Sequence, residues 1–467
     1  MSNTGSTSPS LLTVSNPYDH SLVAEIPYDS LQQMEAKLQS ATAALAKWRL
    51  LSLDDRIRIV SAGLANMRAD AEQIARNVTL QMGKPLAQAR GELQTMFSRA
   101  EQSIADAPTA LAADILPKAG FVRRIEHEPL GIVFDIAAWN YPLVIPINII
   151  VPALLAGNVV LLKHSAKTPF TGQAFADAFA KLEIPDLVTN LTLTHAQTTE
   201  LISNPHIDHV SFTGSVDGGH RIYQAVAQSR LIDVGLELGG KDPAYVAADA
   251  DLDFAAANLV DGACYNAGQS CCAIERVYVH QTLYQPFLEK AAALLAEYQL
   301  GDPLDESTTM GPLASRSAPQ FLQQQVDDAV GRGARLIVGG RAPSELAGNF
   351  YLPTLLADVA NDAQVMQEES FGPLLPVSSV CDEDEAVARM NDSAFGLTAS
   401  VWTSDQQRAE AIASRLNAGT IFQNRCDFLD PALPWTGWGD SGKGSTLSPY
   451  GFYYLTRRKS IHFRTAT

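Results

Sequence analysis

The stretch from Ile132 to Lys163 reads IVFDIAAWNYPLVIPINIIVPALLAGNVVLLK, and its interpretation decides the fold class. From Ile136 to Leu162 it carries no charged residue, a length that would suffice to cross a lipid bilayer. Three prolines interrupt it, and each removes a backbone donor that lipid cannot replace. The stretch therefore predicts a buried strand over 132–136, a tight turn, a core helix over 143–156 and a second strand over 159–162, rather than a membrane span.

Strand and helix patterns continue to alternate beyond this stretch. In the first half we expect further strands at 191–193 and 209–212, with helices at 170–182 and 216–227. A second alternation predicts strands at 243–246, 273–279, 336–338 and 400–402, and helices at 251–262, 283–298, 320–332, 383–390 and 405–416. Such alternation is typical of parallel, doubly wound sheets, so the fold class is α/β, with a ligand cleft expected between the two halves.

The chain ends follow other patterns. A hairpin is predicted over 12–27, followed by helices to about Ala107, one of them capped by Ser52. Alternation over 121–129 predicts a strand pair, and 453–464 predicts a terminal strand that pairs with another subunit. The polar first ten residues lack the charged and apolar regions of a signal peptide, so we expect a frayed tail.

Composition places limits on function. In 467 residues, 34 Lys and Arg against 51 Asp and Glu give a net charge of −17, and 46% of the residues are hydrophobic. These values suit a globular protein of two or three domains. The acidic balance argues against nucleic acid and anionic membranes as partners.

Five cysteines in a chain of this length argue against a disulfide framework and favour a reducing cytoplasm. None of their spacings suits zinc, because Cys271 and Cys272 are adjacent and no histidine pair is near them, so no metal site is expected. Gly268-Gln269-Ser270-Cys271 nevertheless resembles a tight turn that projects a thiol into a cleft. The alternative is that Cys271 is a small buried hydrophobic residue.

Two further positions could support chemistry at a carbonyl group. Glu237 follows an apolar stretch and precedes Gly239-Gly240, so burial would raise its pKa and make it a possible base. Asn140, between a strand and a helix, could donate to a developing oxyanion. The alternatives are a solvent-exposed glutamate at a strand end and an asparagine that caps the following helix.

Two more motifs are weak evidence of a binding site when each is taken alone. Phe212-Thr213-Gly214-Ser215 ends a strand before a helix, a geometry that binds phosphate, although Ser215 could be an ordinary N-cap. Glu368-Glu369-Ser370-Phe371-Gly372-Pro373 could be an acidic loop followed by a turn.

The order and spacing of these motifs are far more specific than any one of them. Together with Lys163 and Ser441-Gly-Lys-Gly444, they make the chain resemble the NAD(P)-dependent aldehyde dehydrogenase superfamily from about Asn16 to Ser460. The resemblance implies that Cys271 is the nucleophile, Glu237 the general base and Asn140 the oxyanion donor. It implies hydrolytic oxidation of an aldehyde to a carboxylate through a thiohemiacetal and a thioester.

The resemblance also implies a cofactor site. Glu369 would hold the nicotinamide ribose, Phe371 would pack near the nicotinamide, Lys163 would meet the adenosine ribose and Ser215 the pyrophosphate. Further cofactor contacts would come from Trp139, Ser165, Ala166, Lys167, Gly214, Gly219 and Leu238. Substrate contacts would come from Tyr141, Arg425 and Trp435.

The implied architecture has a Rossmann-like cofactor domain (1–107 and 130–239), an α/β catalytic domain (240–441) and a small β oligomerisation element (108–129 and 442–467). We expect a homodimer or homotetramer that acts on a small-molecule aldehyde.

The sequence departs from the family pattern at several points. Ala138 stands where the family often has proline before Trp139. The family commonly has an acidic residue three positions after the ribose lysine, and this chain has Ala166. An acidic residue there would bind both ribose hydroxyls and repel a 2′-phosphate, so we expect NADP to be accepted, with Lys163, Ser165, Lys167 and His164 as possible phosphate contacts. Arg425, in the segment that lines the substrate entrance in the family, could bind an anionic substrate or form a surface salt bridge.

Two alternative functions are also compatible with the fold that the sequence predicts. A CoA-acylating aldehyde dehydrogenase of the same fold commonly lacks the general base, which Glu237 argues against. A non-catalytic protein could keep the fold, although Cys271, Glu237 and Asn140 are all present.

Overall fold

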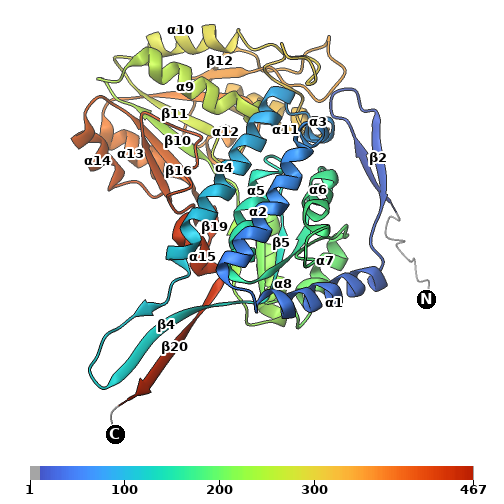
Figure 1. Ribbon diagram of the computed structural model, residues 1–467. Helices are drawn as coiled ribbons and strands as arrows, with labels where there is room; N and C mark the ends of the chain where they lie inside the picture. Colours follow the sequence, from blue (N-terminus) through green and yellow to red (C-terminus); the bar gives the residue numbers. More distant parts are fainter. Residues whose placement is uncertain (1–10, 466–467) are drawn as a thin grey trace, which may run out of the picture.

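The computed structural model describes residues 11–465 and contains two mainly parallel sheets and a long, narrow arm that projects away from them (Figure 1). The predicted polar tail at residues 1–10 lies outside the described residues. The expected α/β class with two parallel sheets is confirmed.

The first sheet has six strands in the order β19-β9-β8-β5-β6-β7, and all but β19 are parallel. Chain order reverses between β5 and β8, and ligands of doubly wound sheets bind outside the carboxyl ends of the strands at such a switch point. Its elements are β5 (Ile132–Ile136), α5 (Val144–Ala156), β6 (Val159–Lys163), α6 (Pro169–Ala180), β7 (Val188–Asn190), α7 (His195–Ile202), β8 (His209–Thr213), α8 (Val216–Ser229), β9 (Val234–Glu237) and β19 (Gly442–Lys443).

The charge-free stretch forms the centre of this sheet and the helix beside it. Every residue of α5 except Ile145 is buried, which explains why the helix has no polar face. Across residues 11–465, no helix is both long enough and apolar enough to span a bilayer.

The helices that begin the chain cover the first sheet, and α4 packs along α5. They are α1 (Leu31–Trp48), α2 (Leu53–Ala69), α3 (Ala71–Met82) and α4 (Leu86–Ala110). The predicted cap is confirmed, because Ser52 Oγ accepts the Asp55 N–H at 3.2 Å. The predicted hairpin is also confirmed, with β1 (Leu11–Ser15) antiparallel to β2 (Leu22–Pro27).

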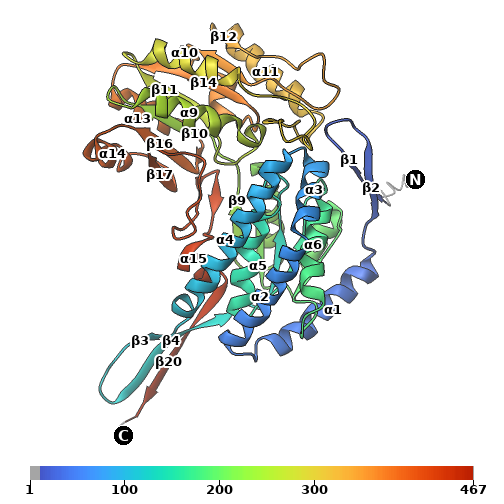
Figure 2. The same cartoon turned by 45° about the horizontal axis from the view of Figure 1, so that its top comes forward.

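The second sheet has seven strands in the order β12-β13-β14-β11-β10-β16-β17, of which only β12 is antiparallel to its neighbour. Figure 2 shows it above the first sheet, with its own helices. Its strands are β10 (Asp242–Val246), β11 (Ile274–His280), β12 (Arg335–Val338), β13 (Thr354–Ala357), β14 (Leu374–Val380), β16 (Thr398–Trp402) and β17 (Thr420–Gln423). Its helices are α9 (Leu252–Cys264), the 3-10 turn η1 (Tyr265–Gly268), α10 (Tyr284–Leu295), α11 (Ala318–Gly331), α12 (Gln364–Gln367), α13 (Glu383–Asn391) and α14 (Gln406–Ala413).

Each sheet has its own hydrophobic core. Buried side chains between Met34 and Leu238 form the first, together with Phe452 and Leu455 from near the end of the chain. Buried side chains between Ala244 and Ala418 form the second. Two further short strands, β15 (Phe395–Gly396) and β18 (Trp438–Gly439), pair with each other, and the helix α15 (Ser448–Tyr454) packs on α4 and α5.

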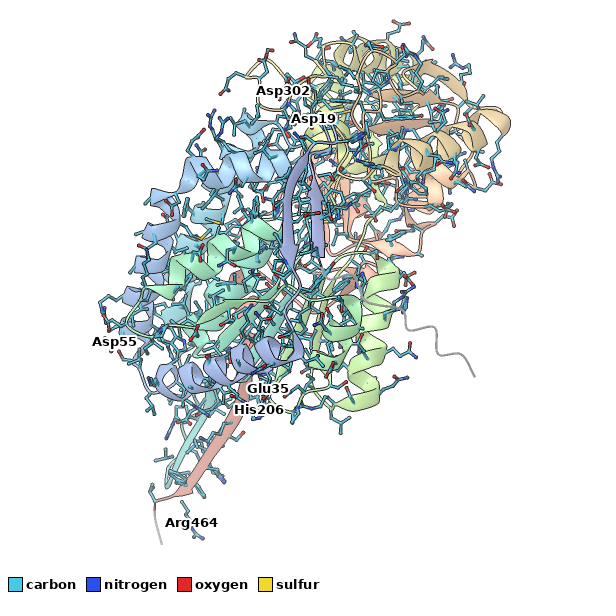
Figure 3. The ribbon with its side chains drawn as sticks, turned by 90° about the vertical axis from the view of Figure 1, so that its right-hand side faces the viewer. Asp19, Glu35, Asp55, His206, Asp302 and Arg464 are labelled. Carbon is cyan, nitrogen blue, oxygen red and sulfur yellow. The ribbon has the colours of Figure 1, made fainter. Side chains whose placement is uncertain are left out.

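The arm corrects one prediction. Residues 121–129 form one strand, β4 (Phe121–Pro129), rather than a strand pair, because its partners come from elsewhere in the chain: β3 (Asp114–Ile115) and β20 (Thr456–Arg464). The predicted terminal strand is present as β20 and pairs along its full length with β4 of the same chain, while pairing of its other edge with another subunit stays a prediction. Figure 3 shows Arg464 at the tip of this arm, far from both sheets.

The strand predicted at 191–193 is wrong, since the third strand of that half is β7, immediately before it. Leu191 and Leu193 lie between β7 and α7 and pack into the first hydrophobic core, so their apolar character alone suggested a strand. The short strands β9, β13, β14 and β17 were not predicted, because runs of four to seven residues give little periodic signal.

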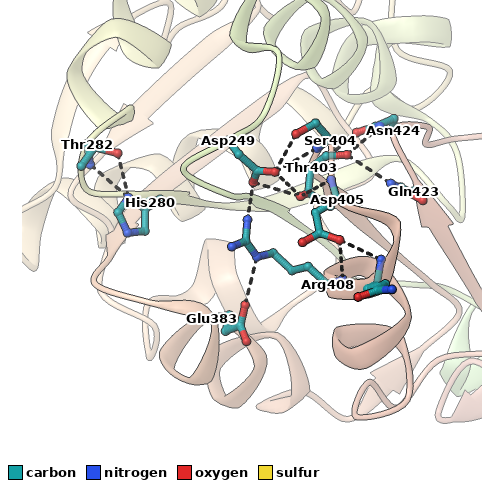
Figure 4. A network of polar contacts seen from close by, with 11 residues as sticks. Asp249, His280, Thr282, Glu383, Thr403, Ser404, Asp405, Arg408, Gln423 and Asn424 are labelled. Carbon is teal, nitrogen blue, oxygen red and sulfur yellow. Dashed lines mark hydrogen bonds and ion pairs between the residues drawn. The ribbon is translucent and has the colours of Figure 1, made fainter.

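Polar side chains tie the helices to the second sheet. Arg408 of α14 donates to Asp249 at 2.6 Å and lies 3.5 Å from Glu383, while Thr403 donates to the same aspartate (Figure 4). At the other end of α13, the buried Arg276 of β11 donates to four backbone carbonyls: those of Lys241 and Met390 at 2.9 Å, Arg389 at 3.2 Å and Asp392 at 3.3 Å.

Arg276→Met should lower the free energy of unfolding by about 2–4 kcal/mol, because buried carbonyls would lose their donors. Thermal unfolding followed by circular dichroism measures this loss. Arg335→Met is the matched control, since its ion pair with Asp358 is exposed, and it should destabilise the protein far less. Equal destabilisation by the two variants would contradict the role given to Arg276.

Candidate active site

A cavity of about 540 Å³ lies between the two sheets. It opens beyond the carboxyl ends of β5 and β8, where a doubly wound sheet is expected to bind ligands. Most of the residues singled out from the sequence line it: Trp139, Asn140, Tyr141, Gly214, Ser215, Glu237, Leu238, Cys271, Glu369, Phe371 and Trp435.

Cys271 follows a short loop of unusual backbone conformation. Asn266, Ala267 and Gly268 have φ angles of 52°, 56° and 71°, in the left-handed region. A Cβ at Gly268 would lie 2.3 Å from the carbonyl oxygen of Gly372, so only glycine fits there. The loop is therefore fixed against the segment that carries Phe371, and it brings Cys271 to the cavity wall.

Side-chain amides join this loop to Asn140. Asn140 Nδ2 donates to the Gln269 carbonyl at 3.2 Å, and Asn266 Nδ2 donates to the Asn140 carbonyl at 3.0 Å. An asparagine amide has two N–H groups, so the second one of Asn140 stays available for a ligand beside Cys271.

The two adjacent thiols differ in environment. Cys271 is half-buried, whereas Cys272 is 2% exposed and lies 3.1 Å from Asp427 Oδ1. A hydrogen bond with Cys271 and burial raise the pKa of Cys272 well above its usual range, which disfavours its thiolate. The backbone forms a turn at these residues, and both thiols line the cavity.

Glu237 lies at the end of β9, beside Thr213 at the end of β8. Its Oε1 accepts from Thr446 Oγ1 at 2.5 Å, and its Oε2 lies 3.4 Å from Thr213 Oγ1. Burial raises its pKa, while the threonine bonds and the positive charge of Arg99 lower it. The carboxyl group is thus oriented toward the cavity and is more basic than a carboxylate in solvent.

Buried polar contacts position Glu369 and Phe371. Glu275 Oε2 accepts from Lys241 Nζ at 2.5 Å and from the Ser370 N–H at 2.7 Å, and its Oε1 accepts from the Phe371 N–H at 2.9 Å. Phe371 packs edge-on against Trp139, with ring centroids 5.4 Å apart.

The Glu369 carboxylate approaches the backbone very closely. It accepts the Gly240 N–H at 2.9 Å, and a Cβ at Gly239 would lie 2.4 Å from its oxygens. Burial, with the nearby Glu275 charge, raises the pKa of Glu369 to about 8. Gly239 is therefore needed for this contact, while a Cβ at Gly240 would instead lie 2.3 Å from the Cys271 carbonyl oxygen.

The loop after β6 comes close to the cavity at Lys167. Lys163 is buried, and Lys167 Nζ lies 5.7 Å from the centroid of the Trp139 ring, so Lys167 points inward rather than into solvent. Ser165 Oγ accepts the Lys167 N–H at 3.3 Å, and Ala166 is exposed. None of these four residues lines the central cavity itself.

His164 is not free to contact a cofactor, contrary to the sequence expectation. Its Nε2–H donates to the Pro142 carbonyl at 2.9 Å, and its Nδ1 accepts from Thr168 Oγ1 at 3.0 Å. Burial lowers its pKa to about 4, so the neutral ring serves as a structural link.

Ser215 and Gly219, at the start of α8, have different structural roles. Ser215 is the N-cap, and its Oγ accepts the Gly218 N–H at 3.2 Å, as the alternative interpretation expected. Gly219 does not line the cavity: it is buried against Leu238, where a Cβ would come within 2.7 Å of the leucine side chain. Gly219 therefore acts by letting Leu238 reach the cavity wall.

Arg425 is exposed and is not among the residues that line the cavity. Its guanidinium stacks 3.3 Å from the ring centroid of Phe428, which does line the cavity, so a contact with substrate at the entrance stays a prediction. Trp435, by contrast, is 5% exposed and lines the cavity as predicted.

Two residues of α4 at the cavity, Glu92 and Arg99, were not predicted from the sequence. Glu92 forms a buried ion pair with Lys84, and its Oε1 accepts the N–H groups of Leu143 and Val144, which fixes the turn that carries Asn140. Glu92 and Arg99 are seven residues apart and lie on the buried, apolar face of the helix. Charged residues on such a face are the signal that could have revealed them.

Comparison with known proteins agrees with the set of residues that line the cavity. The model of the aldehyde dehydrogenase family matches residues 4–461. A succinate-semialdehyde dehydrogenase (NADP(+)) of Deinococcus radiodurans is 35% identical over 96% of this chain and 93% of its own length. A 3,6-anhydro-alpha-L-galactose dehydrogenase of Streptomyces coelicolor is 34% identical over 97% of this chain and 93% of its own length.

Solved structures agree as well. The succinic semialdehyde dehydrogenase of Streptococcus pyogenes, solved in complex with NADP+, superposes with a TM-score of 0.93 at 29% identity, covering 97% of this chain and 100% of that one. A match of this extent, in sequence and in both sheets, shows that the protein belongs to the aldehyde dehydrogenase family and is an NAD(P)+-dependent enzyme that oxidises an aldehyde to a carboxylate.

Proposed function

We propose that Cys271 is the nucleophile, Asn140 the oxyanion donor and Glu237 the general base of this oxidation. The observation that supports it best is their convergence on one cavity, from a loop of the second sheet, the turn after β5 and the end of β9. Three separate segments supply a thiol, an amide donor and a buried carboxyl group, the set that covalent oxidation of a carbonyl needs.

In the first step the Cys271 thiolate attacks the aldehyde carbon and forms a thiohemiacetal. The negative charge that develops on the oxygen is stabilised by the free N–H of Asn140 and by the Cys271 backbone N–H. Because the amide network holds Asn140 against the cysteine loop, this donor needs no reorganisation during the step.

NAD(P)+, when bound, accepts the hydride that leaves the thiohemiacetal carbon. Cys271 then holds the acyl group as a thioester. Glu237 takes a proton from water, the hydroxide adds to the thioester carbon, and the carboxylate product leaves as the thiolate is restored. A basic, threonine-oriented carboxyl group at this place favours hydrolysis over transfer of the acyl group to CoA.

The residues around the cavity fit the cofactor. Glu369 would hold the nicotinamide ribose, Phe371 and Trp139 would flank the ring, and the first turn of α8 would face the pyrophosphate with N–H groups. Lys163 would reach the adenosine ribose.

The inward position of Lys167 supports acceptance of NADP. Its ammonium group, with the exposed Ala166 beside it, gives a 2′-phosphate a cation and no repelling carboxylate. We therefore propose that NADP is used at least as well as NAD.

We also propose the division into a cofactor domain (1–107 and 130–239), a catalytic domain (240–441) and an oligomerisation element (108–129 and 442–467), in a cytoplasmic homodimer or homotetramer. The two separate cores support the first two parts. The projecting arm supports the third, because it exposes Ile115, Val122 and Phe463 and offers the free edge of β20 for pairing.

Cys271→Ala should reduce aldehyde-dependent formation of NADPH by about three orders of magnitude or more, since no thiohemiacetal can form. Cys272→Ala is the matched control and should keep most of the activity, because its thiol is buried and disfavoured as a thiolate. The assay is absorbance of NADPH with a panel of aldehydes. Full activity in Cys271→Ala would exclude the mechanism.

Glu237→Gln should slow steady-state turnover while preserving a burst of NADPH, because hydride transfer precedes hydrolysis. Stopped-flow absorbance after rapid mixing separates the two phases. In the wild type, turnover should rise with pH through the raised pKa of Glu237, since only the ionised carboxylate accepts a proton, and this dependence should disappear in the variant. A burst that falls in step with turnover would place the base before hydride transfer.

Ala166→Glu should shift preference toward NAD by adding a carboxylate against the 2′-phosphate, at a cost to NADP of about 1–3 kcal/mol. Steady-state kcat/KM with each cofactor measures the shift, and NAD serves as the internal control. A wild type that prefers NAD by about a hundredfold or more would show that residues outside this loop exclude the phosphate.

A further inference from the structure

Arg99 brings a positive charge into the wall of the cavity. It extends from α4, its exposed fraction is 7%, and it lines the cavity together with Asn148 of α5. Among the described residues that line this space, it is the only lysine or arginine.

The Arg99 guanidinium has few hydrogen-bond partners. Its Nε is buried without a hydrogen-bond partner, and its Nη1 reaches Asn148 Oδ1 only at 3.5 Å. Within residues 11–465, no carboxylate oxygen comes within 4.0 Å of its nitrogens. The mechanism proposed above gives it no direct part.

Three other deeply buried basic side chains have partners within the chain. Lys84 is paired with Glu92 and Lys241 with Glu275, while Arg276 donates to four backbone carbonyls. Lys163 is buried as well, but it lies outside this cavity. Arg99 is thus the one cation among the described lining residues, and the side chain that its guanidinium contacts is the neutral Asn148.

An uncompensated buried charge is expensive, because the lost hydration is not replaced. Burial lowers the pKa of Arg99, yet a guanidinium stays protonated in proteins. Such a group is stabilised when an anion enters the cavity and accepts from it.

We propose that Arg99 binds a carboxylate at the far end of the aldehyde substrate, which makes the preferred substrates short aldehydes with a second, anionic end. The inference rests on the proposed function, since it takes Cys271 as the group that meets the aldehyde carbon. The planar fork of a guanidinium matches a carboxylate with two parallel hydrogen bonds, and Asn148 orients the fork from one side.

The charge of the lining favours a singly charged group. Glu92, Glu237, Asp261, Glu369 and Asp427 all contribute carboxyl groups to the same cavity. A phosphate with nearly two negative charges would meet more repulsion from them than a carboxylate would.

A rival role for Arg99 is electrostatic support of Glu237, whose pKa it lowers. In that case its loss would slow hydrolysis for every aldehyde and would shift the pH profile in the same way for each. Recognition of a substrate carboxylate predicts instead a loss that depends on the charge of the substrate.

The experiment compares succinate semialdehyde with butanal, which has the same number of carbons and no charge. The wild type should have the higher kcat/KM for succinate semialdehyde. In Arg99→Met the ratio of the two kcat/KM values should fall about thirtyfold or more, as expected for loss of one partner of a buried charged pair. Arg99→Lys should restore part of the ratio, because it keeps the charge without the fork.

Arg425→Met is the matched control, since Arg425 is exposed outside the cavity, and it should leave the ratio unchanged. Succinate should inhibit the wild type competitively against the aldehyde more strongly than butanamide does, a measurement that needs no variant. A wild type that prefers butanal, or equal losses for both aldehydes in Arg99→Met, would overturn the proposal. Absence of NADPH formation with any aldehyde would instead count against the proposed function.

Discussion

The buried ion pair between Lys241 and Glu275 is the contact on which the active site depends most. Lys241 lies where the chain leaves the first sheet after β9 and enters the second at β10, and Glu275 belongs to the neighbouring strand β11. The same glutamate accepts the backbone N–H groups of Ser370 and Phe371. One carboxylate therefore holds together the junction between the sheets and the loop that carries Glu369. A buried pair of this kind contributes little net stability, but removing one partner leaves an uncompensated charge, so the geometry is well defined.

A second buried pair works in the same way on the opposite side of the cavity. Lys84 neutralises Glu92, and Glu92 accepts the first N–H groups of α5, where the helix has no side-chain cap of its own. The turn that carries Asn140 is thereby fixed from α4. Because α4 also supplies Arg99, one helix both shapes the site and places in it a charge that the protein does not neutralise.

Local backbone strain completes the site. Left-handed conformations at Asn266 and Ala267 are uncommon for residues other than glycine, and the amide network around Gln269 compensates for them. Gly268 was recognisable from sequence as a turn residue. The conformation of the two residues before it was not, because Asn266 is held by its hydrogen bond to the carbonyl of Asn140, which lies far away in the chain.

Local patterns in the chain were enough to predict the α/β class, most helices, the charge-free core helix and the motifs whose order identifies the family. These features depend on local periodicity and on residue types at short spacing, which a single chain records directly. The pairing of β20 with β4, the stacking of Arg425 on Phe428, the structural role of His164 and the position of Arg99 at the cavity were visible only in the folded molecule. Strand partners and side-chain directions depend on contacts between residues hundreds of positions apart, and no local pattern in the chain encodes them.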